Sequence, residues 1–311
     1  MTFKDFLRAV RTRQWAKNAL LFGGFIFAGR LRASAAHPYP LEDGLRVLMA
    51  FACFCALSGA AYLINDWQDL ERDRAHPIKQ HRPLASGRIS LRVAFVMLAV
   101  LLTSALVLGL AVVMNGKGTW GFGISALFYF ALTLAYSFRL KHEVIIDVLS
   151  VAAGFLVRVV AGCLAVPVDI SPWILFCTFN LALFVALNKR RAELLEVGEG
   201  GTTRKVLQGY SVPMLDTFIA VAAALTIISY SLYTFNAPHI QALGPRFGQS
   251  PFPLLMLSVP FVVYGVFRFL LLAHSSPVGG EPEQMLRDRP MIINAVLWTL
   301  LVSLLTVLSS I

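Results

Sequence analysis

The residues best suited to chemistry lie in the segment NDWQDLERDRAHPIKQHRPLASGRIS, at positions 65–90. In a helix that continues through its first part, Asp66, Asp69 and Asp73 are spaced i, i+3 and i+7, so their side chains fall within about 60° of one another. Asn65 lies four residues before Asp69 and can add an amide to this face. Three carboxylates on one face repel each other unless a cation lies among them. The pattern predicts a Mg²⁺ site made by these four residues, because Mg²⁺ binds one or two carboxylates together with phosphate oxygens.

Basic residues follow the acids at once, which favours a phosphate ligand. Arg74, Lys79 and Arg82 lie within nine residues, together with two histidines, and Pro83 then ends the helix. A diphosphate is therefore the ligand that the segment predicts. The alternative is an ordinary solvated loop of mixed charge, and the regular spacing of the acids argues against it.

Two charged residues, Asp147 and Arg158, lie inside the apolar stretch VIIDVLSVAAGFLVRVVAG. Charges inside a membrane are costly, so they indicate function by default. Eleven residues of helix return to within about 20° of the same face and separate the two by roughly 16 Å along the axis. We interpret them as a stripe lining a polar cavity, with Asp147 near the cytoplasmic mouth. The alternative is a structural pair made with neighbouring helices.

Two further connections carry candidate binding residues. The segment YSFRLKHEVIID contains Tyr136 and Lys141 at a helix end, where bases bind phosphate or anchor the helix at the membrane surface. The segment NKRRAELLEVGEG begins with Lys189 and Arg190, and Glu193 follows. Bases mixed with acids suit a highly anionic ligand better than they suit a pure metal site.

The elements that must position these residues are membrane helices. Of the 311 residues, 57% are hydrophobic and 14% are charged, and the mean hydropathy is +0.70, which is far from the composition of soluble domains. Stretches of roughly 20 apolar residues are long enough to cross a bilayer. We expect an all-α, polytopic bundle in a single domain over residues 1–311, with the active-site cavity on the cytoplasmic side. The nine predicted spans are 17–30, 45–64, 93–114, 119–138, 144–166, 172–188, 212–235, 252–273 and 291–311.

The distribution of bases sets the expected orientation. Of the 27 Lys and Arg residues, 20 lie in one set of alternate connections, five in the other set and two within spans. The positive-inside rule then places the N-terminus and the active site in the cytoplasm and the C-terminus outside, in an inner (plasma) membrane. The net charge of +10 reflects bases beside anionic headgroups, so the bilayer is the expected partner and nucleic acid is not. The sequence does not determine the number of subunits, and a homo-oligomer is compatible with it.

The motif NDWQDLERDRAHP, the segment YSFRLKHEVIID and the connection after the sixth span make the chain resemble the UbiA-type intramembrane prenyltransferase superfamily, which has nine helices and a cytoplasmic NDxxDxxxD motif. The resemblance covers essentially the whole chain. With these segments, RTRQWAKNALLF, GFLVRVVAG, LNKRRAEL and MLRDRP look most like the branch that transfers phosphoribose to decaprenyl phosphate. Aromatic-acceptor members carry a second aspartate-rich motif where this chain reads LNKRRAELLEV, so a second Asp-bound Mg²⁺ is not implied.

This resemblance implies the reaction. The donor would be 5-phosphoribosyl 1-diphosphate and the acceptor a polyprenyl phosphate, giving polyprenylphosphoryl-5-phosphoribose for the synthesis of cell-envelope arabinose donors. The acceptor phosphate is already anionic, so positioning and charge neutralisation would suffice without a strong general base. The implied catalytic residues are Asp66, Asp69, Asp73 and Arg158. The implied substrate-binding residues are Gln14, Lys17, Asn65, Arg74, Lys79, Arg82, Tyr136, Lys141, Asp147, Lys189, Arg190 and Glu193.

Two other functions stay open at this point. An aromatic-acceptor prenyltransferase would share the fold and the first acidic motif, but it should also have a second acidic motif. A transporter or lipid flippase often has inverted repeats, and we find none in the sequence. A carrier also has no need for three acids on one helix face outside the membrane core.

Overall fold

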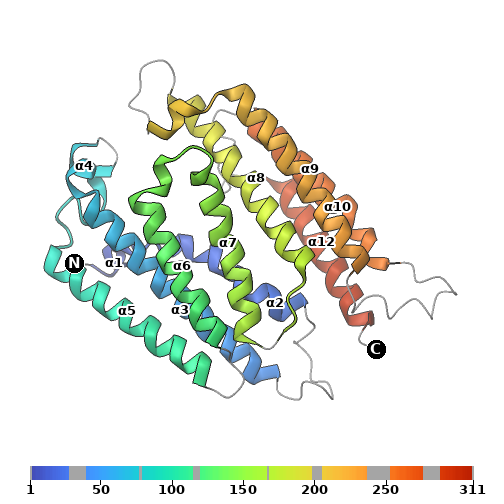
Figure 1. Cartoon of the computed structure of the whole chain (residues 1–311), viewed down its shortest axis with the longest axis horizontal. Coiled ribbons are helices and arrows are strands. Elements are labelled where there is room, and N and C mark those ends of the chain that lie inside the picture. The colour runs from blue at the N-terminus through green and yellow to red at the C-terminus, as the bar shows by residue number, and fades with distance from the viewer. Residues whose placement is uncertain are drawn as a thin grey trace. The chain divides into compact units, whose positions relative to one another are not determined.

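The computed structural model describes residues 2–27, 40–76, 79–114, 120–166, 168–197, 205–236, 253–275 and 288–309. Every regular element in these ranges is a helix, which confirms the expected all-α class (Figure 1). In chain order the elements are α1 (Phe3–Ala9), η1 (Thr12–Leu21), α2 (Phe22–Phe27), α3 (Pro40–Gln68), α4 (Leu70–Ala75), η2 (Lys79–His81), α5 (Leu91–Met114), α6 (Trp120–Phe138), η3 (Leu140–His142), α7 (Ile146–Ala165), α8 (Pro172–Val197), η4 (Lys205–Gly209), α9 (Val212–Asn236), η6 (Leu254–Ser258), α10 (Val259–Ser275) and α12 (Arg289–Ser309).

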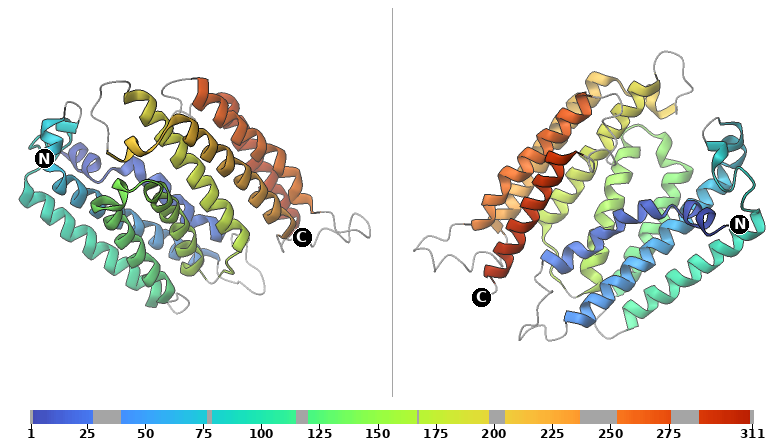
Figure 2. Two further views of the ribbon diagram at one scale, coloured as in Figure 1. Left: turned by 45° about the horizontal axis from the view of Figure 1, so that its top comes forward. Right: turned by 180° about the vertical axis from the view of Figure 1, so that it is seen from behind.

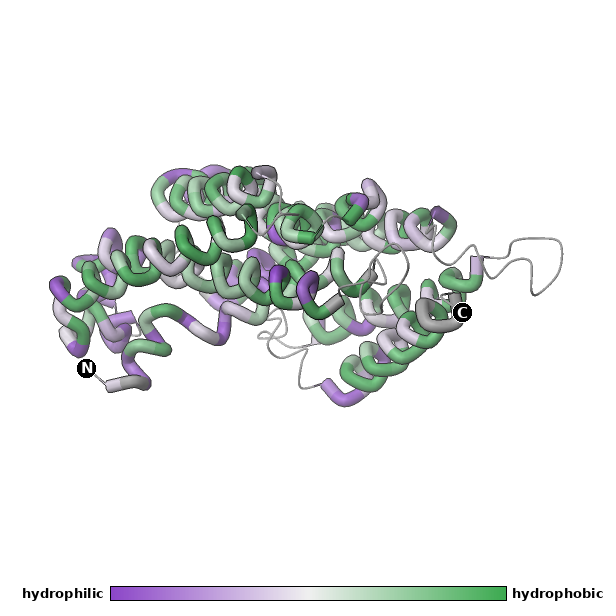
Figure 3. The backbone as a smooth tube through the Cα atoms, turned by 90° about the horizontal axis from the view of Figure 1, so that it is seen from below, coloured by the Kyte–Doolittle hydropathy of each residue, from purple (hydrophilic) through white to green (hydrophobic). Residues whose placement is uncertain are grey.

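Seven helical segments in the described part of the chain are long and apolar enough to cross a membrane. They are α3, α5, α6, α7, α8, α9 and the continuous η6–α10 segment, and each overlaps a predicted span. The helix α8 continues to Val197, beyond the predicted end at residue 188, so Lys189, Arg190 and Glu193 lie on this helix and not in a loop. Figure 3 shows these long helices as mostly hydrophobic along their lengths. The last predicted span coincides with α12, whose apolar part Arg289–Leu305 is shorter. The protein is therefore a multi-pass membrane protein, and the total of nine spans stays a prediction.

The first predicted span, residues 17–30, is described only in part, and it stays a prediction. A 3₁₀ helix, η1, ends at Leu21 and is followed by the six-residue α2, and residues 28–30 lie outside the described ranges. This segment packs closely against α7. A Cβ atom added at Gly162 would lie 2.1 Å from the backbone oxygen of Leu21, and one added at Gly24 would lie 2.5 Å from Cys163 Sγ. Small residues allow such backbone approach between membrane helices.

The described chain divides into two compact units, and the expectation of one domain stays a prediction. Unit 1 consists of Met1–Leu140 and Val157–Asp169, and unit 2 of Lys141–Leu156 and Ile170–Ile311. In unit 1, α3 packs against α5, α6 and the N-terminal segment. The dark-blue N-terminal segment runs beside α3 in the right view of Figure 2. Phe54 and Phe122 are fully buried in the core of unit 1.

Unit 2 is built around the contact of α8 with α9, and α10 and α12 pack beside them. Its core includes Phe184, Leu215 and Ile219. Arg268 of α10 forms a two-point ion pair with Asp288, at 2.8 Å and 3.1 Å. Asp288 Oδ1 also accepts the backbone N–H of Met291, so one carboxylate caps α12 and ties it to α10.

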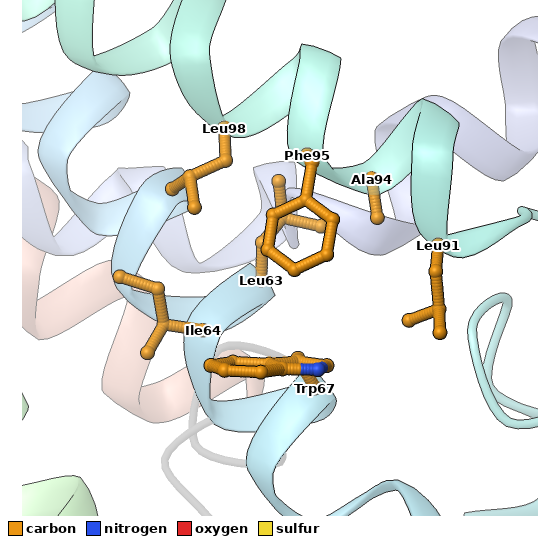
Figure 4. A pocket seen from close by; sticks show the side chains of 7 residues that line it. All are labelled: Leu63, Ile64, Trp67, Leu91, Ala94, Phe95 and Leu98. Carbon is orange, nitrogen blue, oxygen red and sulfur yellow. The ribbon is translucent and has the colours of Figure 1, made fainter.

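The C-terminal turns of α3 have two faces of opposite character. Trp67 is 49% exposed and packs edge-on against Phe95 of α5, with ring centroids 5.6 Å apart. Figure 4 shows these rings in an apolar notch between α3 and α5, which is lined by Leu63, Ile64, Trp67, Leu91, Ala94, Phe95 and Leu98. Asp66, the residue before Trp67, is buried. None of the residues that line the notch is acidic.

Candidate active site

The acidic motif spans the junction between α3 and α4. Asp69 breaks the helix for one residue, with φ −89° and ψ 8°. The hydrogen-bond pattern nevertheless continues, because Asp69 N–H donates to the Asn65 carbonyl at 2.9 Å and Asp73 N–H donates to the Asp69 carbonyl at 2.8 Å. Asp66 and Asp73 therefore keep their helical spacing, and both are buried.

Two arginines lie against these buried carboxylates. Arg82 Nη1 donates to Asp73 Oδ2 at 2.6 Å and lies 3.3 Å from Asp66 Oδ1. Arg11 Nη2 donates to the same Asp66 oxygen at 2.5 Å, and its guanidinium carbon lies 4.5 Å from the centre of the Tyr62 ring. Asp66 and Asp73 thus share one cationic nitrogen, although seven positions of chain separate them.

The other residues of the motif take less central positions. Asn65 and Asp69 are half-buried, and Asp69 lies 3.9 Å from the exposed Arg72. Arg74 is exposed and pairs with Glu71 at 2.9 Å, and Lys79 is half-buried in η2. Within the described residues, no three His, Cys, Asp or Glu side chains are gathered as a ready-made metal site. Of the four predicted metal ligands, Asp66 and Asp73 are the pair that converges on one cation.

Arg158 is the centre of a buried polar network in unit 1. Its Nε donates to Asn18 Oδ1 and its Nη2 donates to the Tyr129 hydroxyl, both at 2.7 Å. The Tyr129 hydroxyl also lies 2.9 Å from Ser58 Oγ, and Asn18 Nδ2 donates to Ser58 Oγ at 3.3 Å. Asn18 belongs to η1, so the network binds the N-terminal segment to α3, α6 and the part of α7 that belongs to unit 1. This explains how Asn18, a polar residue of η1, is completely buried.

Asp147 is the centre of a second network, which lies in unit 2. Its side chain is completely buried, and Arg190 Nε donates to its Oδ2 at 2.6 Å. The Tyr210 hydroxyl donates to its Oδ1, also at 2.6 Å. Arg190 Nη1 also donates to Glu193 Oε2 at 2.5 Å. Burial and the bond to Asp147 raise the pKa of Tyr210 above its usual value of about 10, so the phenol stays protonated and able to donate.

The predicted stripe on α7 therefore has a partner set at each end. Asp147 and Arg158 both lie on this helix, at positions that belong to different units, and each bonds to side chains of its own unit. Such contacts are what a purely structural role for Asp147 and Arg158 requires. They are equally the contacts that hold a charged side chain in one orientation.

The remaining predicted residues lie at surfaces or element ends. Gln14 is half-buried in η1 and Lys17 is exposed there. Tyr136 is half-buried near the end of α6, and Lys141 is half-buried in η3. Lys189 is exposed on α8, beside the buried Arg190.

Several residues with central contacts were not assigned to the site from the sequence, among them Arg11 and Tyr210. In the sequence, Arg11 is one of the cytoplasmic bases and the first residue of the segment RTRQWAKNALLF, but the acids that it contacts lie far along the chain. Its backbone adopts a left-handed conformation, with φ 50° and ψ 54°, which is uncommon for a residue other than glycine. Tyr210 follows a short 3₁₀ helix and belongs to no recognisable motif, so nothing in the sequence distinguishes it.

Comparison with known proteins determines the family. A model of the UbiA prenyltransferase family matches residues 22–192. The chain belongs to the UbiA prenyltransferase family. The matched residues contain the acidic motif, the two charges of α7 and Arg190, so both networks lie within or reach into the part that defines the UbiA family.

Two curated UbiA-type relatives cover most of the chain. The decaprenyl-phosphate phosphoribosyltransferase of Mycolicibacterium smegmatis is 32% identical over 295 residues, which are 94% of this chain and 89% of that protein. The enzyme of the same name from Corynebacterium glutamicum is 32% identical over 296 residues, covering 94% and 83%. The structure of a UbiA homologue from Archaeoglobus fulgidus bound to GPP and Mg²⁺ superposes with a TM-score of 0.68 at 19% identity, over 97% of this chain and 99% of that one. The predicted UbiA-like fold is confirmed.

Proposed function

We propose that this protein transfers the 5-phosphoribosyl group from 5-phosphoribosyl 1-diphosphate to a polyprenyl phosphate, releasing diphosphate. The single structural observation behind the proposal is that buried Asp66 and Asp73 converge on one nitrogen of Arg82, at 3.3 Å and 2.6 Å. Two carboxylates that converge on one cation are suited to hold a divalent metal ion, which can in turn bind a ligand with a dense negative charge. The names of two relatives that are 32% identical over the aligned residues support a decaprenyl phosphate as acceptor and a phosphoribosyl group as the group transferred.

The acidic motif also fits a divalent metal ion, which we propose to be Mg²⁺. Asp66 and Asp73 would hold it, with Asn65 and Asp69 supplying further oxygens from the same junction, because hard oxygen donors are the ligands that Mg²⁺ prefers. Bound there, the ion would neutralise negative charge on the departing diphosphate. Arg82 and Arg11 already neutralise these acids, so both guanidiniums are placed to bind phosphate oxygens once a metal ion takes over the carboxylates.

The other proposed roles belong to each unit separately. In unit 1, Gln14 and Lys17 would bind the lipid phosphate where η1 begins, and Arg158 would supply a buried positive charge. In unit 2, Arg190 would bind phosphate from an orientation set by Asp147 and Glu193. The residues proposed to contribute further substrate contacts are Arg74, Lys79, Tyr136, Lys141 and Lys189.

No step in this scheme requires a strong base. The acceptor phosphate is anionic before the reaction, so its oxygen can attack the anomeric carbon of the ribose as the diphosphate leaves from the opposite face. The residues would therefore act by positioning and by charge neutralisation. We place the reaction on the cytoplasmic side of an inner membrane, where the bases of the predicted cytoplasmic connections lie and where a water-soluble diphosphate donor is available.

The test uses purified protein in detergent with phosphoribosyl-labelled donor and a polyprenyl phosphate. We expect label to enter the organic phase only in the presence of a divalent ion, and EDTA to abolish the transfer. A parallel reaction contains a prenyl diphosphate and an aromatic acid. Prenylation of the aromatic acid without phosphoribosyl transfer would contradict the proposal and assign the chain to the aromatic-acceptor branch.

A further inference from the structure

The hydroxyl of Tyr210 joins two connections of unit 2. Tyr210 lies between η4 and α9, and it is buried. Its oxygen accepts the backbone N–H of Ile145 at 2.7 Å and donates its own proton to Asp147 Oδ1 at 2.6 Å. One phenol therefore holds both the backbone that leads into α7 and the first buried charge of that helix.

The backbone at Ile145 is held in an unfavourable conformation. Its φ is +70°, which is a genuine outlier for a β-branched residue. Such strain persists only where the surroundings impose it. Here the neighbouring positions are in close contact as well, because a Cβ atom at Gly209 would lie 2.4 Å from Val144 Cγ2. Gly209 and Tyr210 thus fix Val144 and Ile145 by two adjacent contacts.

The same phenol acts on Arg190 through Asp147. Asp147 accepts from Tyr210 with one oxygen and from Arg190 Nε with the other. Arg190 Nη1 reaches Glu193, so two acidic groups orient the guanidinium. Without the phenol, Asp147 Oδ1 would lose this donor in a fully buried position, and the carboxylate would be free to turn. Arg190 would then lose the alignment that this carboxylate imposes.

We infer that Tyr210 is a positioning residue for the binding of the phosphorylated donor. It touches no substrate itself. It sets the Arg190 guanidinium through Asp147, and through Ile145 it sets the path of the connection that carries Lys141 in η3. This inference rests on the proposed function. It adds a residue that affects the affinity for the donor by orienting the groups that bind it.

The test compares two tyrosine hydroxyls of the same unit. Tyr210→Phe removes the hydroxyl that bonds to Ile145 and Asp147. The matched control is Tyr230→Phe, because Tyr230 is equally buried and its hydroxyl also makes two bonds, to Ser258 at 2.7 Å and from Trp298 at 2.9 Å. Both variants should lose thermal stability. Only Tyr210→Phe should raise the KM and the Kd for 5-phosphoribosyl 1-diphosphate, by about tenfold, with kcat changed by no more than about threefold.

A second variant keeps the test decisive if Tyr210→Phe does not purify. Arg190→Lys keeps the charge and removes the oriented guanidinium, and we expect a similar rise in the donor Kd. Where both can be purified, the double variant should be little worse than either single one, because both disrupt the same arrangement.

The outcomes separate this inference from the proposed function. Absence of donor binding by the parent protein would overturn the proposed function and the role of Tyr210 with it. Donor binding that is normal in Tyr210→Phe, or weakened equally in Tyr230→Phe, would overturn only the role of Tyr210. If Tyr210→Phe cannot be purified, normal donor binding by Arg190→Lys overturns that role.

Discussion

Arg11 Nη2 donates to Asp66 Oδ1 at 2.5 Å, although 55 positions separate the two residues in the chain. This contact attaches the N-terminal segment to the acidic end of α3. It also explains how Asp66 can be buried, because a buried carboxylate needs a partner of opposite charge or several hydrogen-bond donors. Arg82 supplies the second charge to the same oxygen.

Removal of Arg11 should destabilise the protein. Arg11→Ala leaves the buried Asp66 with one fewer cation, and we expect a loss of about 1–3 kcal/mol, reduced from a fully buried pair because Arg11 is partly exposed. The matched control is Arg13→Ala, which removes the same charge from an exposed position two residues away. Thermal unfolding in detergent measures both. Equal melting temperatures for the two variants would contradict the structural importance of the Arg11 contact.

Neutralising Asp73 should abolish most of the activity. Asp73→Asn keeps the size of the side chain and removes the charge that Arg82 and the proposed metal ion share. We expect kcat/KM to fall by about 100-fold or more, as for other groups that stabilise charge during a reaction. Glu71→Gln on the same short helix α4 should stay near the parental rate, since that carboxylate is 83% exposed. A folded Asp73→Asn protein with near-normal turnover would exclude the metal-site assignment.

The contact between Gly162 and Leu21 predicts that alanine substitutions at two glycines will differ in their effect on stability. Gly162→Ala would place a methyl group 2.1 Å from the Leu21 carbonyl oxygen, and we expect a loss of about 1–3 kcal/mol from overpacking. Gly23→Ala serves as the control, because no heavy atom outside its neighbours lies within 4 Å of its added Cβ. Detergent melting curves should separate the two variants by several degrees. A Gly162→Ala protein as stable as Gly23→Ala would show that η1 and α7 do not approach this closely.

The strained backbone at Ile145 predicts that glycine is tolerated there. Ile145→Gly relieves a left-handed conformation that costs a β-branched residue about 1–2 kcal/mol, and this offsets the entropy cost of glycine. We expect unchanged or slightly higher stability. Ile146→Gly, at the start of α7 and similarly exposed, should instead cost about 1 kcal/mol. The prediction fails if the two variants lose stability equally.

The raised pKa of Tyr210 predicts a loss of stability in alkali. The unfolded protein releases the phenol proton near pH 10, whereas the folded protein retains it to higher pH because of burial and the bond to Asp147. Above about pH 10 the folded state binds more protons than the unfolded state, so stability falls as pH rises. The melting temperature of the parent protein should therefore approach that of Tyr210→Phe between about pH 10 and 11. A constant difference over this range would exclude the effect.

Much of the fold follows from local properties of the sequence. The length and hydropathy of each apolar stretch predict α3 and the later long helices, because a membrane helix satisfies its own backbone hydrogen bonds and needs no distant partner. The exception is the N-terminal segment. Its apolar residues alone predict a span, and only the structure shows that Asn18 is buried there and that Leu21 lies close to Gly162.

The candidate site also has a part that the sequence predicts and a part that depends on tertiary packing. By itself the sequence determined the acidic face, because Asp66 and Asp73 are separated by two helical turns. It also determined the membrane class and the family resemblance. Only the tertiary structure decided that Arg11 and Arg82 lie against those acids and that Tyr210 and Arg190 share Asp147. The physical reason is that periodicity depends on neighbours within a few residues, whereas the partner of a buried charge depends on which distant segments the packing of the helices brings together.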